Sequence, residues 1–165
     1  MKRKYLILFS LSGLVLTFDQ LTKYLVLART DLGAPQAIIP GFLNLVLAKN
    51  NGFAFGFLRQ APQSLQGIFF IAVPVFALIL IILIFIKLRD DQMLSSIALT
   101  TILGGAIGNL IDRVQYGYVV DFLDFHLGDS HLPPFNVADL SIILGVLLMF
   151  VSTLTQKETG GEVNA

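Results

Sequence analysis

The chain contains no cysteine, two histidines and few charged residues for its length of 165 residues. Without cysteine it cannot form disulfides or thiolate metal sites, and it has no cysteine nucleophile. A zinc site on His126 and His131 would have to rely on carboxylate ligands, so we expect neither a metal nor another cofactor. Charged residues make up 13% of the chain, about half of the roughly 25% that is typical of soluble domains.

The charges that are present balance, with 11 basic and 11 acidic residues. A net charge of zero gives no electrostatic footprint for nucleic acid, so we expect no nucleic-acid partner. Hydrophobic residues make up 55% of the chain, which indicates a membrane protein.

Four hydrophobic segments reach the length of about 20 residues that a membrane-spanning helix needs. They cover approximately residues 5–28, 67–87, 93–112 and 139–156, which predicts an all-α membrane protein with four transmembrane helices. We expect a single integral membrane domain, residues 1–165, with outer segments at about 29–66 and 113–138, acting as a monomer.

The basic residues predict the orientation of these spans. Lys2, Arg3 and Lys4 precede the first span, Lys87 and Arg89 separate the second and third, and Lys157 follows the fourth. With four spans they all fall on one side, which the positive-inside rule makes cytoplasmic. Both termini are therefore expected in the cytoplasm.

The first span carries Asp19 and Lys23, spaced as i and i+4 with the acid first. This order favours a helical ion pair, and in a membrane each partner lowers the cost of the other. We expect the pair to stabilise packing. A basic start before an apolar run also fits a cleavable signal peptide, but these two charges interrupt the run and favour an uncleaved helix.

The first outer segment is rich in β-forming residues from 37 to 47, with turn signals at Pro40-Gly41 and at residues 50–52. It predicts a small extracytoplasmic β-element, followed by an amphipathic surface segment that contains Phe53, Phe55 and Phe57. A disordered loop is the alternative, but it would leave many large apolar side chains in water.

Asp121 and Asp139 lie at the ends of a short polar segment, and each is flanked by apolar residues. A carboxylate at the edge of a bilayer is costly, so its presence indicates a function. Taken alone, Asp139 fits a helix N-cap where the fourth span begins, but that interpretation leaves Asp121 unexplained. The other acids of this segment, Asp124 and Asp129, are expected to be solvated.

Polar residues also gather at the outer end of the third span. Asn109, Asp112 and Arg113 are spaced so that all three can share one helix face, although the charged residues could instead snorkel to the interface. Gly104 and Gly108 in the same span form a GxxxG pattern, which predicts close packing against another helix.

If the carboxylates of Asp121 and Asp139 converge, they can share one proton, because like charges a few ångströms apart cannot both ionise easily. The ionised partner would take a proton from a water that attacks a carbonyl carbon. The protonated partner would polarise that carbonyl and then protonate the leaving amine. Such hydrolysis requires no metal, thiol or serine–histidine pair.

Five blocks carry these polar residues: Asp19-Gln20-Leu21-Thr22-Lys23, Asn50-Asn51-Gly52-Phe53-Ala54-Phe55-Gly56, Gly108-Asn109-Leu110-Ile111-Asp112-Arg113, Val119-Val120-Asp121-Phe122 and Phe135-Asn136-Val137-Ala138-Asp139. In this order, on four predicted spans, they resemble the lipoprotein signal peptidases (signal peptidase II), which are bacterial four-helix membrane aspartyl peptidases. The resemblance covers nearly the whole chain.

The resemblance implies hydrolysis of the peptide bond just before a diacylglyceryl-modified cysteine in a prolipoprotein, with Asp121 and Asp139 as the catalytic pair. It also implies a bacterial plasma membrane location, a site near the extracytoplasmic surface, and lipid-modified substrate and membrane lipids as partners. Phe53 stands where the family often has a small residue, which puts local packing in doubt. Supporting or substrate-binding roles fall on Asn50, Gly52, Asn109, Asp112, Arg113 and Asn136, and structural roles on Asp19 and Lys23.

Two other classes stay open on the residues alone. A small proton-coupled transporter would place acids near the membrane midplane and contain inverted repeats, whereas these acids lie at span ends and the two halves show no repeat. In a structural membrane subunit the acids would be caps and snorkelling ends, and replacing either aspartate with asparagine would change only stability.

Overall fold

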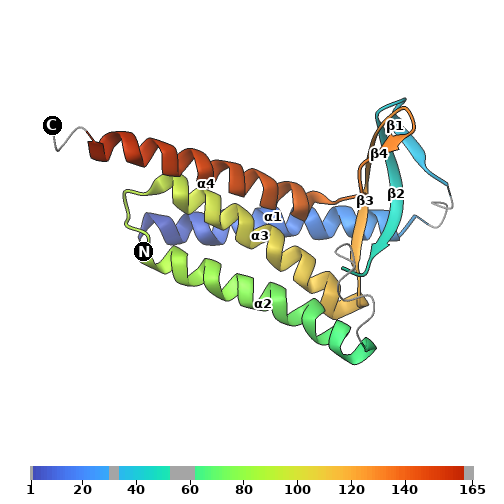
Figure 1. The fold of residues 1–165 in the computed structure, drawn as a ribbon, viewed down its shortest axis with the longest axis horizontal. Helices are drawn as coiled ribbons and strands as arrows, with labels where there is room; N and C mark the ends of the chain where they lie inside the picture. Colours follow the sequence, from blue (N-terminus) through green and yellow to red (C-terminus); the bar gives the residue numbers. More distant parts are fainter. Residues whose placement is uncertain (1, 30–33, 53–61, 162–165) are drawn as a thin grey trace.

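The computed structural model describes residues 2–29, 34–52 and 62–161. Within these residues four helices form a bundle, and a small sheet stands across one of its ends (Figure 1). The helices are α1 (Arg3–Leu27), α2 (Gln63–Lys87), α3 (Met93–Tyr116) and α4 (Val137–Gly161), each long and apolar enough to cross a membrane. The prediction of four apolar helices of membrane-spanning length is confirmed, although α3 continues beyond residue 112 and α4 begins before residue 139.

Small residues let the helices approach α3 closely. A Cβ added at Gly104 would lie 2.9 Å from Val15 of α1, and one at Gly108 would clash with the carboxylate of Asp19. The predicted GxxxG contact is therefore confirmed, with α1 as the partner. On the other face of α3, the absent side chain of Gly105 makes room for the Ala138 carbonyl of α4.

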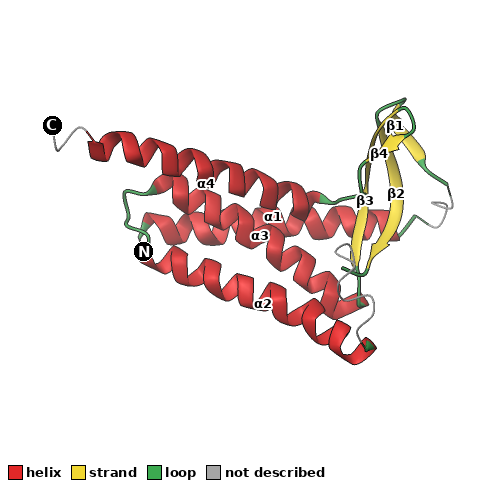
Figure 2. Ribbon diagram, viewed as in Figure 1, coloured by secondary structure: helices red, strands yellow, loops and turns green. Residues whose placement is uncertain are grey.

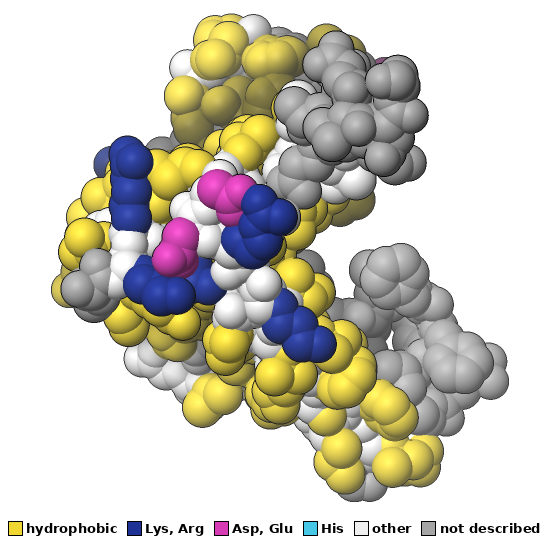
Figure 3. Space-filling model, turned by 90° about the vertical axis from the view of Figure 1, so that its left-hand side faces the viewer, with side chains coloured by type: hydrophobic (Ala, Val, Ile, Leu, Met, Phe, Trp, Pro, Cys, Tyr) yellow, Lys and Arg dark blue, Asp and Glu magenta, His cyan; other side chains and the backbone are white. Residues whose placement is uncertain are grey.

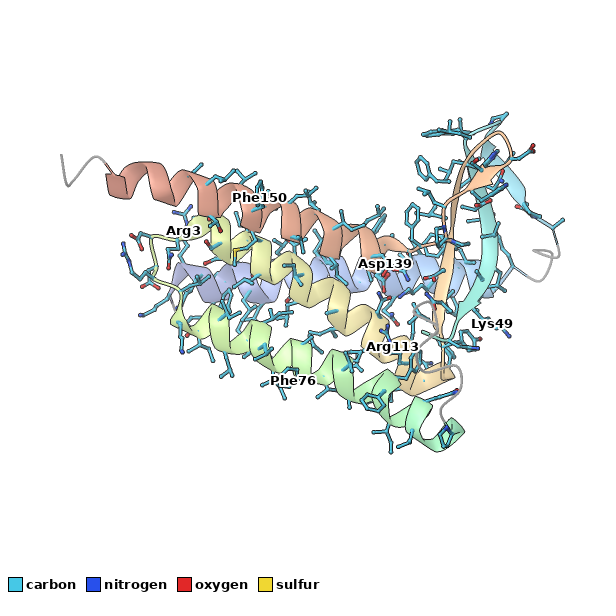
Figure 4. The ribbon with its side chains drawn as sticks, viewed as in Figure 1. Arg3, Lys49, Phe76, Arg113, Asp139 and Phe150 are labelled. Atoms are coloured by element: carbon cyan, nitrogen blue, oxygen red, sulfur yellow. The ribbon has the colours of Figure 1, made fainter. Side chains whose placement is uncertain are left out.

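Most large side chains on α1, α2 and α4 point away from the bundle, as expected for helices whose solvent is lipid. Phe9, Phe76 and Phe150 are each more than 60% exposed, and the last two project outward from their helices (Figure 4). The core of α3 is by contrast small and polar. Buried polarity therefore concentrates along α3.

The sheet contains β1 (Gln36–Ile39), β2 (Leu43–Asn50), β3 (Val119–Leu127) and β4 (Ser130–His131), paired in that order and antiparallel (Figure 2). The expected strand pair in the first outer segment is confirmed, with its turn at Gly41. The strand β3 was not predicted. It joins the two outer segments into one sheet and carries Asp121 opposite Ala48.

One expectation for the outer segments is wrong. Asp124 is not a solvated loop acid but is 5% exposed on β3, where it accepts hydrogen bonds from Asn44 of β2 (3.1 Å) and contacts Nδ1 of His131 (2.9 Å). The hydrogen bond with His131, supported by that from Asn44, holds the pKa of this carboxyl below its usual range despite the raising effect of burial. The predicted amphipathic segment with Phe53, Phe55 and Phe57 lies outside the described residues.

Candidate active site

The polar residues singled out in the sequence meet at the end of the bundle that the sheet covers. Asp139 comes from the start of α4 and Arg113 from the end of α3, and both lie beside β3 (Figure 4). α1 reaches the same region with Asp19 and Lys23. Four elements thus bring together groups that are far apart in the chain, such as the Asp19 carboxylate and the Ala138 N–H, which are 119 residues apart.

Asp139 is held in the first turn of α4, but it is not the N-cap. The Oδ1 atom of Asn136 accepts a hydrogen bond from the Asp139 backbone N–H (2.9 Å), and the Asp139 Oδ2 atom accepts one from the Asn136 N–H (3.2 Å). This reciprocal arrangement is a capping box with Asn136 as the cap. The interpretation of Asp139 as the N-cap is therefore wrong, because the cap lies three residues earlier. The Oδ1 atom of Asp139 takes no part in the capping box and accepts a hydrogen bond from the Asn109 side chain (2.7 Å).

Asp121 is 2% exposed on β3. Its two carboxylate oxygens accept hydrogen bonds from the side-chain amides of Asn50 (2.9 Å, to Oδ2) and Asn136 (2.7 Å, to Oδ1). Burial raises the pKa of Asp121 to about 6, and the charge of Asp139 acts in the same direction, against the lowering effect of the two amides. The two aspartates therefore interact, and Asp121 retains a proton at pH values where an ordinary carboxyl has lost it.

Asn136 links the two aspartates. It is fully buried, and one side-chain amide bonds both carboxyl-bearing residues: Nδ2 donates to the Asp121 carboxylate while Oδ1 accepts from the Asp139 backbone. The Asn136 N–H completes the link by donating to the Asp139 carboxylate. A single residue thus fixes the orientation of one aspartate relative to the other.

A buried ion-pair cluster lies beneath the pair, and we call its three residues, Asp19, Lys23 and Asp112, the Lys23 cluster. The ammonium of Lys23 lies 2.9 Å from Asp19 Oδ2 and 2.8 Å from Asp112 Oδ2, and both carboxylates are fully buried. The predicted pairing of Asp19 with Lys23 is confirmed. The snorkelling alternative fails for Asp112, which faces the bundle interior.

Arg113 extends along the edge of the site. Its guanidinium Cζ lies 4.9 Å from the centre of the Phe70 ring of α2, and its Nη1 donates to the Asn109 carbonyl (2.9 Å). Its Nε is buried without a hydrogen-bond partner among the described residues. Gly52, with φ +74°, also abuts Phe70, and a Cβ there would lie 2.6 Å from the ring. A side chain at this position would be strained in its backbone conformation and would displace the Phe70 ring, which favours glycine.

Sequence reasoning missed Phe70 and Gln20. Nothing distinguishes Phe70 within an uncharged apolar span. Gln20 donates to Asp112 Oδ1 (3.0 Å) and to the Gly108 carbonyl (3.2 Å), and its signal was that of a polar residue beside Asp19 in an apolar run. Within the described ranges, no group of three or more histidine and acidic side chains is arranged to hold a metal ion.

A membrane bundle that ends in two aspartates linked by one buried asparagine, with Asp121 buried and Asp139 half-buried, has the architecture of a membrane aspartic peptidase. Residues 11–155 match the family profile described as signal peptidase (SPase) II. The chain belongs to this family and is an aspartic-type peptidase.

Individual relatives agree with this assignment. Proteins named lipoprotein signal peptidase from Syntrophus aciditrophicus and Maridesulfovibrio salexigens are 42% and 43% identical to the chain, over 94% and 93% of its length and 98% and 99% of their own. A solved bacterial membrane enzyme aligns with a TM-score of 0.78 at 34% identity, over 94% of this chain and 90% of its own. The four-helix membrane fold is therefore shared with solved enzymes.

Proposed function

We propose that the protein removes the signal peptide from diacylglyceryl-modified prolipoproteins, cutting just before the lipidated cysteine, with water activated between Asp121 and Asp139. The observation that carries the proposal is the link through Asn136, which bonds both aspartates at once. An amide shared in this way holds two carboxyl groups toward one reacting centre. A helix cap accounts for the two bonds between Asn136 and Asp139, but not for the bond from Asn136 to Asp121.

The environments of the two aspartates favour different roles. Asp121 keeps a proton up to about pH 6 because it is buried, so it suits the acid that polarises the substrate carbonyl and protonates the leaving amine. Asp139 lies in the first turn of α4, where the helix dipole favours a negative charge. In this proposal Asp139 takes the proton from the attacking water. Each turnover returns one proton to the pair and consumes one water.

The architecture suits a lipid-modified substrate. A signal-peptide helix and acyl chains already lie in the bilayer, so the substrate reaches the site by lateral diffusion. Each buried CH₂ of the acyl chains contributes about 0.8 kcal/mol to binding. Exposed apolar side chains on α2 and α4 offer surfaces for lipid along the bundle.

The proposed orientation places the site at the extracytoplasmic surface of a bacterial plasma membrane. α1 begins and α4 ends at the opposite end of the bundle from the sheet (Figure 1). That opposite end carries a cluster of basic side chains mixed with acids (Figure 3), among them exposed Lys2, Arg3, Lys87 and Arg89. The positive-inside rule makes it cytoplasmic.

The test is a single-turnover assay with a lipidated precursor peptide. Asp121→Asn and Asp139→Asn should each abolish cleavage while the protein still folds and inserts, as judged by gel filtration and thermal unfolding in detergent. A metal chelator should leave the rate unchanged. Full activity in either asparagine variant would exclude the proposed chemistry, and strong inhibition by the chelator would point to a metal-dependent reaction.

A further inference from the structure

The ammonium group of Lys23 is saturated by three oxygen acceptors. It donates to Asp19 and Asp112 and, at 2.9 Å, to the side-chain oxygen of Asn109. An ammonium has three N–H groups and no acceptor, and the side chain is 2% exposed. Lys23 is therefore fixed in one position, and each side chain that contacts its ammonium group must direct an acceptor oxygen toward it.

This requirement orients Asn109. Because the Asn109 oxygen must face Lys23, its NH₂ group must face the opposite way, and there it donates to the Asp139 carboxylate at 2.7 Å. Asn136 adds a second donor to the same Asn109 oxygen (3.1 Å). A flipped Asn109 would place two donors against each other beside Lys23 and leave Asp139 facing an oxygen.

The two acids of the Lys23 cluster hold the backbone beside each member of the aspartate pair. Asp19 Oδ1 accepts a hydrogen bond from the N–H of Ala138, the residue before Asp139, at 2.8 Å. Asp112 Oδ2 accepts one from the N–H of Val120, the residue before Asp121, at 3.0 Å. One buried cluster thus bonds the backbone of α4 next to Asp139 and the backbone of β3 next to Asp121.

We infer that the Lys23 cluster is a positioning device for hydrolysis, which sets the separation and orientation of Asp121 and Asp139 through Asn109 and two backbone N–H groups. The inference rests on the proposed function and assigns the cluster a role beyond packing. A misplacement of about 1 Å in a catalytic group can cost about 100-fold in rate. Loss of one of these two backbone bonds should therefore lower kcat by about 100-fold. KM should stay within about twofold of its value in the unaltered protein.

The test compares Asp112→Leu with Asp112→Asn in steady-state cleavage of the lipidated precursor. Both Lys23 and the Val120 N–H use the same oxygen, Oδ2, so an asparagine can keep both contacts with its remaining oxygen, whereas leucine keeps only the shape. Asp112→Leu should lose about 100-fold in kcat, and Asp112→Asn should recover at least about tenfold of that loss.

Ser152→Ala is the matched control, because it removes a buried hydrogen bond between α3 and α4 (to Ser95, 2.8 Å) away from the site. It should lower thermal stability without lowering kcat. If Asp112→Leu does not fold, the charge-balanced double variant Lys23→Met with Asp19→Asn takes its place, with the same expected loss of kcat.

The outcomes separate this inference from the proposed function. A folded variant of the Lys23 cluster with kcat within about threefold of the unaltered protein would overturn the positioning role but not the proposed function. Changes in kcat and KM that Ser152→Ala reproduces would do the same. Absence of cleavage by the unaltered protein would overturn both the proposed function and the positioning role. Loss of kcat with unchanged KM, and recovery by asparagine, would support the positioning role.

Discussion

Replacing Asn50 with alanine should move the pH dependence of cleavage toward higher pH. In the proposed mechanism Asp121 acts in its protonated form, which dominates below about pH 6 and is lost as the pH rises. Cleavage therefore declines on the alkaline side. The Asn50 amide donates to the Asp121 carboxylate at 2.9 Å and lowers the pKa of this group, so its removal lets the proton persist to higher pH.

The size of the effect follows from the hydrogen bond. A bond to a charged group contributes about 1.5–3 kcal/mol, and the lower value applies because Asn50 is exposed. Since one pH unit corresponds to about 1.36 kcal/mol, the alkaline midpoint should rise by about one pH unit. At about pH 8 the variant should then keep about tenfold more of its maximal rate than the unaltered protein does.

The assay is single-turnover cleavage of the lipidated precursor from about pH 5 to about pH 9, a range that brackets the expected alkaline midpoint of both proteins. Asn44→Ala provides a matched control. It removes an equivalent cross-strand bond from β2 to an aspartate of β3, Asp124, and should leave the midpoint unchanged. An Asn50→Ala midpoint that stays in place or moves to lower pH would refute the reasoning. A rate that rises with pH through about 6 in the unaltered protein would reverse the roles of the two aspartates.

Two further substitutions test the packing and the cap. Gly108→Ala should destabilise the protein by about 1–3 kcal/mol and reduce cleavage, because the new methyl group meets the Asp19 carboxylate. Gly13→Ala, with nothing within 4 Å of its Cβ, should leave both thermal unfolding and cleavage unchanged, and equal effects at the two positions would contradict this account. Asn136→Ala should cost about 1 kcal/mol through loss of the helix cap and abolish single-turnover cleavage. Retained cleavage would show that the catalytic arrangement of the two aspartates does not depend on Asn136.

The four helices could be predicted because each is an apolar run of membrane length, and only the first is interrupted by charges, at Asp19 and Lys23. The strand β3 could not, because its sequence lacks the alternation of a half-exposed strand. Val119, Val120, Asp121 and Phe122 are all buried in succession, and β3 contacts α1 and α3 as well as its neighbouring strands. Without that alternation an apolar run broken by acids is indistinguishable from a loop.

The site could be predicted only in part. The Asp19–Lys23 pair is local to one helix, and the Asn136-x-x-Asp139 spacing of the capping box was readable in principle. The contacts of Lys23 with Asn109 and Asp112 join segments more than 80 residues apart. Local patterns carry no information on such pairs, and only the likeness to a family indicated that these residues belong together.

The Lys23 cluster also bears on how the chain enters a membrane. Asp19 and Lys23 each add up to about 3 kcal/mol to the insertion of α1 if they reach the bilayer centre, and their mutual contact compensates part of that cost as soon as the helix forms. The remaining acceptors, on Asn109 and Asp112, arrive only with α3. Stable residence of the first helix in the membrane is thus completed by the third. The contacts that neutralise the buried charges of the first helix are thus the same contacts that build the site.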